Sequence, residues 1–142
     1  MSPRVVIDTN VLVGAALNRG GGDNRDVLRA CLKGLARPVI GMALFSEYED
    51  LFLRSALMAK SPLNEKERLI LLESFLSVCE WVKVYYLWRP NLPDEADNHL
   101  IELALAGGAS TIVTNNLRDV TRGELTFPLL NILSPAQFLK TL

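Results

Sequence analysis

Cysteine and histidine, the two residue types that most often bind zinc, are scarce in this sequence. Cys31 and Cys79 are its only cysteines, and His99 is its only histidine. The cysteines lie in separate apolar segments and form no C-x-x-C pair, so we expect reduced thiols in the core. We expect His99 to be an ordinary surface residue of a helix. These absences disfavour a zinc site and a fold that depends on disulfide bonds.

Long apolar runs and an excess of either charge are also missing. No uninterrupted apolar run approaches the roughly 18 residues of a membrane span, and residues 1–4 lead into the first apolar segment without a signal peptide. We therefore expect a cytoplasmic protein with no membrane partner. The 15 basic and 16 acidic residues give a net charge of −1. Nucleic-acid binding thus cannot be argued from the total charge.

Glycine motifs for nucleotide binding are absent as well. The run Gly20-Gly21-Gly22 is followed by Asp23-Asn24, whereas a P-loop needs a lysine and a serine or threonine at that place. We therefore expect a surface loop here. No G-x-G-x-x-G motif follows the first apolar segment, which argues against a dinucleotide-binding Rossmann domain.

What the sequence does contain is a regular alternation of strand and helix patterns. A chain of 142 residues corresponds to one domain, residues 1–142, and its hydrophobic fraction of 49% is ordinary for a globular protein. The alternation predicts a central parallel sheet of four or five strands with helices on both faces, a three-layer α/β/α fold. The expected strands are residues 5–7, 38–40, 81–85, 111–113 and 129–133. The expected helices are residues 11–17, one that Asp23 or Asn24 caps and that reaches Leu35, then 42–58, 64–79, 94–106 and 134–142.

Acidic and amide side chains follow four of the expected strands. In a parallel sheet such positions meet at the carboxyl edge, where ligands bind in open α/β sheets. The alternative is that these residues cap helices or lie on the surface, with Asp8 capping the helix that follows it. The residues are Asp8 after the first strand, Glu47 after the second, Asp94 and Asp97 after the third, and Asn116 and Asp119 after the fourth.

Carboxylates gathered at one edge require compensation of their charge. Two of them about 4 Å apart repel each other by roughly 4 kcal/mol at an effective dielectric constant near 20. Such a cluster takes up protons or binds a cation. Oxygen ligands favour Mg²⁺ or Mn²⁺, and a metal of this kind suits the chemistry of phosphate esters.

The order and spacing of these residues resemble a known family. The segments VVIDTNVLV (residues 5–13), DEADNHLIELA (residues 94–104) and IVTNNLRD (residues 112–119), with Glu47 early in the helix after the second strand, resemble the PIN-domain family. The resemblance is greatest to the short VapC-like proteins, which are toxins of toxin–antitoxin modules. It implies a PIN-like, Rossmann-like fold and a Mg²⁺- or Mn²⁺-dependent endoribonuclease that hydrolyses RNA phosphodiester bonds. It also implies an antitoxin partner and a homodimer.

The resemblance assigns roles residue by residue. Asp8, Glu47 and Asp97 match the acids that bind the metal and carry catalysis, and Asp94 is an accessory ligand. Where many family members have a fourth acid, this chain has Asn116, with Asp119 three residues further on. This departure favours one tightly bound metal over two. The supporting residues implied are Thr9, Asn10, Ser46 and Thr114.

Residues that would grip RNA are less distinctive. Single-stranded RNA is bound by basic and aromatic side chains, but each candidate arginine in this chain is more typical of an ordinary surface residue. Trp81 and Trp88 can stack on bases, although packing in the core or in a dimer is the simpler expectation. The candidate arginines are Arg25, Arg54, Arg89, Arg118 and Arg122.

Two other functions compete with a nuclease. A degenerate PIN domain that acts as a binding or assembly module is favoured by Asn116 and opposed by the intact Asp8, Glu47 and Asp97. A phosphatase of the haloacid-dehalogenase type also begins with an aspartate after its first strand. Those enzymes carry a second aspartate two residues later as general acid, and here that place is Asn10, which cannot act as an acid.

Overall fold

The protein has a central sheet of five parallel strands in the order β3-β2-β1-β4-β5. The computed structural model describes residues 2–17, 22–84, 98–116 and 130–142. The sheet confirms the α/β class and the parallel sheet expected from the alternating patterns. The strands are β1 (Arg4–Ile7), β2 (Arg37–Ile40), β3 (Glu80–Trp81), β4 (Thr111–Val113) and β5 (Asn131–Leu133). The helices are α1 (Thr9–Leu17), α2 (Asp23–Leu32), α3 (Met42–Phe52), α4 (Ser55–Met58), α5 (Glu65–Val78), α6 (Asn98–Gly107) and α8 (Pro135–Leu139).

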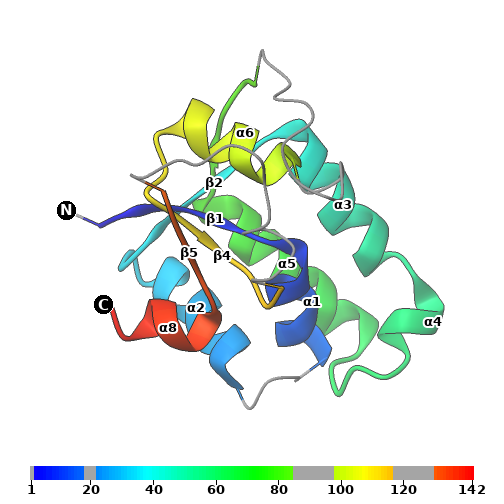
Figure 1. Ribbon diagram of the computed structural model, residues 1–142. Coiled ribbons are helices and arrows are strands. Elements are labelled where there is room, and N and C mark those ends of the chain that lie inside the picture. The colour runs from blue at the N-terminus through cyan, green and yellow to red at the C-terminus, as the bar shows by residue number, and fades with distance from the viewer. Residues whose placement is uncertain (1, 18–21, 85–97, 117–129) are drawn as a thin grey trace.

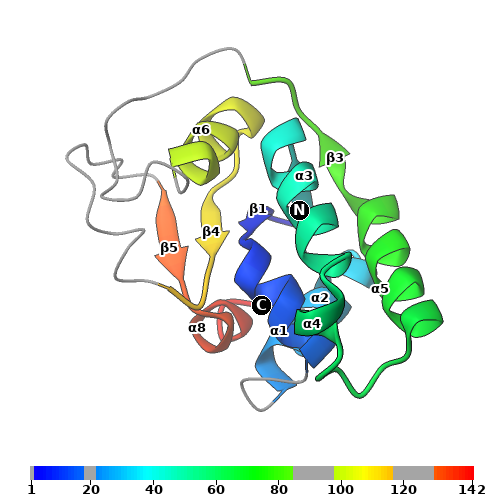
Figure 2. The ribbon, with the colours of Figure 1, turned by 90° about the vertical axis from the view of Figure 1, so that its right-hand side faces the viewer.

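Helices cover both faces of this sheet. Helix α6 packs on β1, β2 and β4, while α2 contacts α1, α5 and α8. Figure 1 shows α6 above the sheet and α2 and α8 below it, and the view in Figure 2, turned by 90°, agrees. The expected three-layer arrangement is therefore present. Among the described residues, no helix is both long and apolar enough to cross a membrane.

Strand β1 lies at the centre and fixes the position of everything at the carboxyl edge. It pairs with β2 on one side and with β4 on the other. Val5, Val6 and Ile7 are fully buried, as expected of a parallel strand that is covered on both faces. The hydroxyl of Tyr48 donates to the carbonyl oxygen of Ile7, so α3 is fastened to the end of β1.

The prediction of one long helix over residues 42–58 is wrong. Helix α3 ends at Phe52, where the amide of Arg54 donates to the carbonyl of Leu51 in a tighter turn, and α4 begins at Ser55. The break lets Met58 turn inward and pack against α1 through Val13. Burial of this side chain against a neighbouring helix therefore outweighs continuation of the helix.

Other element ends also differ from the sequence expectation. Neither Asp23 nor Asn24 caps α2, because the N-cap is Gly22 in a left-handed conformation without a side-chain cap. Helix α2 ends at Leu32, and Leu35 lies outside it. Strand β3 is shorter than expected and stops at Trp81, as is common for an edge strand with one neighbour. Residues 85 and 94–97 lie outside the described residues, and the last helix ends at Leu139.

Two helix starts follow the sequence signals closely. Asn64 accepts a hydrogen bond from the amide of Glu67, whose side chain accepts one from the amide of Asn64. Ser134 and Gln137 form the same reciprocal pair at the start of α8, with Pro135 in its first turn. These capping boxes satisfy backbone amide groups at the helix starts that have no partner within the helix.

Both cysteines are free thiols, and burial raises the pKa of each to about 12.

Candidate active site

Asp8 stands directly beyond β1, at the centre of the carboxyl edge. Its amide donates to the carbonyl of Val113, which extends the pairing with β4, and the residue is only 7% exposed. Its Oδ2 atom accepts hydrogen bonds from the hydroxyl of Thr114 at 2.7 Å and from the amide nitrogen of Asn10 at 3.1 Å. Side chains from α1 and from the end of β4 therefore fix the orientation of this buried carboxylate.

A chain of amide side chains links α1, the segment after β4 and α2. Oδ1 of Asn10 accepts from the backbone amide of Asn115 at 3.0 Å, and Nδ2 of Asn115 donates to Oδ1 of Asn24 at 2.9 Å. Asn24 is buried, and a Cβ added at Gly14 would lie 2.4 Å from its Nδ2. Gly14 therefore leaves the space that Asn24 occupies. Asn24 and Asn115 were not among the site residues expected from the sequence, because nothing local indicates that they meet.

Glu47 approaches the same edge from α3. Its Oε1 accepts a hydrogen bond from the hydroxyl of Thr9 at 2.5 Å, and its Oε2 lies 2.9 Å from Nε2 of His99 on α6. A carboxylate only accepts hydrogen bonds, so Nε2 is the donor in the second contact. The side chain of Glu47 is 38% exposed, so part of the carboxylate remains open to solvent.

The expectation that His99 is an ordinary surface residue is wrong. Its side chain is 19% exposed and bonds to Glu47. The sequence carried one signal for this contact, because His99 lies in the first turn of the helix that follows the third strand. In an α/β sheet that turn faces the carboxyl edge, where the acids gather.

The two acids differ in their electrostatics. Burial raises the pKa of Asp8; the hydrogen bond from Thr114 opposes this rise and the nearby charge of Glu47 adds to it. The hydrogen bond from His99 lowers the pKa of Glu47 against the opposing effect of burial, with a further contribution from Thr9. The anionic form of Glu47 is thus favoured, whereas the buried negative charge on Asp8 is unfavourable unless a cation compensates it.

The residues present fit a hard divalent cation. The carboxylates of Asp8 and Glu47, with the hydroxyls of Thr9 and Thr114 beside them, are oxygen donors of the kind that Mg²⁺ and Mn²⁺ prefer. Within the part of the chain that the structure describes, no three His, Cys, Asp or Glu side chains come close enough to hold a metal together. The remaining expected acids Asp94, Asp97 and Asp119 lie outside the described residues.

The other expected site residues are placed as follows. The backbone amide of Asn116 donates to the hydroxyl of Thr114 at 3.0 Å, so Asn116 adjoins the site. Ser46 is exposed on α3, and consecutive helical residues point in different directions, so Ser46 and Glu47 do not face the same way. Arg25 donates to the carbonyl of Ala15. The candidates Arg89, Arg118, Arg122 and Trp88 lie outside the described residues.

Arg54 and Trp81 each have a partner within the chain. Arg54 forms an exposed ion pair with Asp50 at 2.6 Å. The ring of Trp81 packs against Phe45, with centroids 5.2 Å apart, and Trp81 is still 56% exposed. Packing of Trp81 against a helix is therefore observed, and its exposed part leaves room for a further contact.

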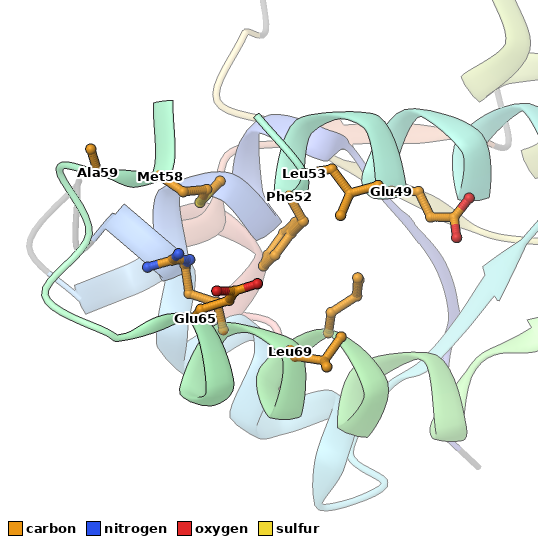
Figure 3. A pocket seen from close by; sticks show the side chains of 9 residues that line it. Glu49, Phe52, Leu53, Met58, Ala59, Glu65 and Leu69 are labelled. Carbon is orange, nitrogen blue, oxygen red and sulfur yellow. The ribbon is translucent and has the colours of Figure 1, made fainter. Parts of the chain in front are cut away.

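A separate pocket with mostly apolar walls lies between α3 and α5. It has a volume of about 450 Å³. Figure 3 shows Phe52 of α3 and Leu53, which directly follows α3, on one side and Leu69 of α5 on the other. Its charged side chains are Glu49, Glu65 and Arg68. None of the site residues expected from the sequence lines this pocket, which we call the α3–α5 pocket.

Comparison with known proteins identifies the family. Residues 4–118 match the PIN domain, so the chain belongs to the PIN-domain family. PIN domains are in general nucleases, which typically use divalent metals. No curated protein sequence matches the chain.

The fold is also similar to a solved structure. A chain in the crystal structure of VapBC2 from Rickettsia felis, bound to a DNA fragment from the promoter, aligns with a TM-score of 0.58. The alignment covers 92% of this chain and 98% of that chain at 19% sequence identity. At this identity the likeness concerns the fold.

Proposed function

We propose that this protein is a metal-dependent endoribonuclease that hydrolyses RNA phosphodiester bonds. The observation that carries the proposal is a buried Asp8, held by Thr114 and Asn10, beside an ionised Glu47 at the carboxyl edge of a PIN domain. Asp97 is proposed as the third acid. Asp94, Asn116 and Asp119 are further candidate ligands of Mg²⁺ or Mn²⁺.

Each described residue has a distinct task in this proposal. Asp8 and Glu47 hold the metal, while Thr114 and Asn10 keep Asp8 in one orientation and Thr9 does the same for Glu47. When bound, such a metal activates water and neutralises charge on the reacting phosphate. The side chains of Thr114 and Asn10 both donate to Oδ2 of Asp8, and an ionised carboxylate offers further lone-pair positions to a cation.

The biological setting belongs to the same proposal. The protein would be the toxin of a toxin–antitoxin module, neutralised by a partner antitoxin, and would form a homodimer. The fold likeness to a chain of the VapBC2 complex supports this setting. RNA would lie along the carboxyl edge with help from basic side chains, among them Arg25, Arg54, Arg89, Arg118 and Arg122.

Cleavage of a labelled single-stranded RNA tests the nuclease directly. We expect the wild-type protein to cut with Mn²⁺ or Mg²⁺ and to stop in EDTA. Asp8→Asn should lower the rate by about 10²–10⁴-fold, the range that corresponds to several kcal/mol of metal stabilisation. Glu73→Gln, the same kind of change at an exposed site on α5, should cut normally. A well-folded wild-type protein that never cuts, with either metal, would contradict the proposal.

A second function is kept because of one residue. Asn116 adjoins Thr114 at the place of the fourth acid, and it carries no charge. A PIN domain without catalysis would serve as a binding or assembly module. In that case Asp8→Asn would leave the affinity for its protein partner unchanged, and the wild-type protein would not cleave RNA.

A further inference from the structure

Glu47 is held by one donor on each of its oxygens. The hydroxyl of Thr9, on α1, donates to Oε1 at 2.5 Å, and Nε2 of His99, on α6, donates to Oε2 at 2.9 Å. The three residues come from three helices, and His99 is 52 residues away from Glu47 in the sequence. The carboxylate plane is therefore fixed from two directions.

Two donors leave part of the carboxylate available. An ionised carboxylate offers about four lone-pair positions on its two oxygens, and Thr9 and His99 occupy one on each. Among the described residues, no other side chain donates to the remaining positions, and they belong to a side chain that is 38% exposed. A cation can therefore bind Glu47 while both hydrogen bonds persist. Because these bonds already fix the carboxylate, its orientation is set before the cation binds.

The imidazole ring of His99 is oriented by its hydrogen bond to Glu47. Its Nδ1 atom is buried and has no hydrogen-bond partner among the described residues, so the bond to Glu47 is the polar contact that orients the ring. The ring also lines a cavity of about 690 Å³ with Leu103 and Trp81. The hydrogen bond to Glu47 is thus the contact that fixes the orientation of the imidazole.

We propose that His99 is a positioning residue of the metal site: its Nε2–H, together with the hydroxyl of Thr9, holds the Glu47 carboxylate in the orientation that binds the cation. This inference rests on the proposed function, because it concerns the same metal. Partners of this kind that orient ligating groups typically change metal affinity by about 10–100-fold. A purely structural link between α3 and α6 would instead change stability and leave metal affinity alone.

Three substitutions at one position separate these two roles. The amide nitrogen of glutamine reaches about as far from the backbone as Nε2 of histidine, whereas that of asparagine ends near Nδ1. Mn²⁺ affinity measured by calorimetry should fall about 10–100-fold in His99→Ala and His99→Asn, and His99→Gln should restore it. Thr9→Val and Thr9→Ser form the matching pair at the other oxygen, with loss expected only in Thr9→Val.

The outcomes distinguish this inference from the function it builds on. If the wild-type protein binds no Mn²⁺, both the nuclease and the positioning role fail. If it binds Mn²⁺ and the three His99 variants bind equally well, the positioning role alone is overturned. If His99→Gln binds as weakly as His99→Ala while remaining folded, the hydrogen bond is not the cause and the inference also fails. Thermal unfolding in EDTA verifies that each variant is folded.

A spectroscopic measurement adds a readout that does not depend on metal affinity. His99 is the only histidine, so the imidazole nitrogen resonances of an untagged protein need no assignment. We expect a proton on Nε2 that persists when Mg²⁺ is added and that exchanges faster in Glu47→Gln, where an amide replaces the carboxylate. Loss of this proton on addition of Mg²⁺ would overturn the inference.

Discussion

The carboxyl edge around Asp8 and the α3–α5 pocket differ in what holds them together. At the edge, polar side chains from α1, α3, α6 and the end of β4 meet through hydrogen bonds between 2.5 and 3.2 Å. In the pocket, the walls are apolar and come chiefly from α3 and α5 (Figure 3). Leu53 and Leu69 there are 79% and 52% exposed.

This difference favours the carboxyl edge over the pocket as the place of the proposed chemistry. Apolar walls provide shape and volume, but they do not orient charge. The carboxyl edge provides two acids with opposite pKa shifts, and each accepts two side-chain hydrogen bonds. We therefore expect changes at the pocket to affect stability and changes at the edge to affect metal binding and cleavage.

The largest effect on stability is expected at the pocket. Met58 lines it, is 1% exposed and packs against Val13 and Leu17. Met58→Ala should lower the free energy of unfolding by about 2–5 kcal/mol, through lost burial and the cavity left behind. Chemical denaturation measures this change, and Mn²⁺ affinity of the folded fraction should stay unchanged.

Leu53→Ala is the matched control on the same pocket. Because Leu53 is 79% exposed, its truncation should change stability by less than about 0.5 kcal/mol. A weaker Mn²⁺ affinity in the folded Met58→Ala protein would show that the pocket and the edge are coupled, and the contrast drawn between them would be wrong.

A smaller effect on the free energy of unfolding, of opposite sign, is expected at the carboxyl edge. Burial raises the pKa of Asp8, so the folded state binds this proton more tightly than the unfolded state. Its contribution to stability is greatest below the ordinary aspartate pKa and is lost as the pH rises through the raised pKa. In EDTA at neutral pH, Asp8→Asn should therefore raise the free energy of unfolding.

The pH dependence of this gain is the test. Unfolding followed across the pH range should show the advantage of Asp8→Asn shrinking as the pH falls, because the wild-type carboxyl becomes neutral. Glu47→Gln should behave oppositely, since the lowered pKa of Glu47 stabilises the folded state at neutral pH and less so in acid. A loss of stability in Asp8→Asn at neutral pH would argue against an unfavourable buried charge on Asp8.

The smallest effect is expected at Arg54, near the end of α3. Its ion pair with Asp50 joins side chains that are 60% and 62% exposed. Arg54→Ala should therefore change stability by less than about 0.5 kcal/mol, as measured by thermal unfolding. RNA affinity measured on the same variant then reports on contact with RNA alone, and unchanged affinity would remove Arg54 from the candidate RNA-binding residues.

Local signals in the sequence were enough for much of the fold. The apolar run at Val5–Ile7 predicted a buried strand, and the helix expected over residues 64–79 is present as α5, with a capping box at its start. Such signals act over a few residues, where backbone geometry fixes which groups can meet. The place of Asp8 at the end of β1 follows from the same local pattern.

Contacts between distant elements were decided by the tertiary structure. The hydrogen bond from Thr114 to Asp8 spans 106 residues and depends on the pairing of β1 with β4. The contact between His99 and Glu47 spans 52 residues and depends on how α3 and α6 pack on the sheet. The end of α3 at Phe52 likewise depends on the burial of Met58 against α1. The sequence by itself determined that Asp8 follows the buried strand β1 and that Glu47 lies in the helix after β2. The tertiary structure decided which donors hold these two acids, because hydrogen bonds between distant residues require contacts that only the folded chain provides.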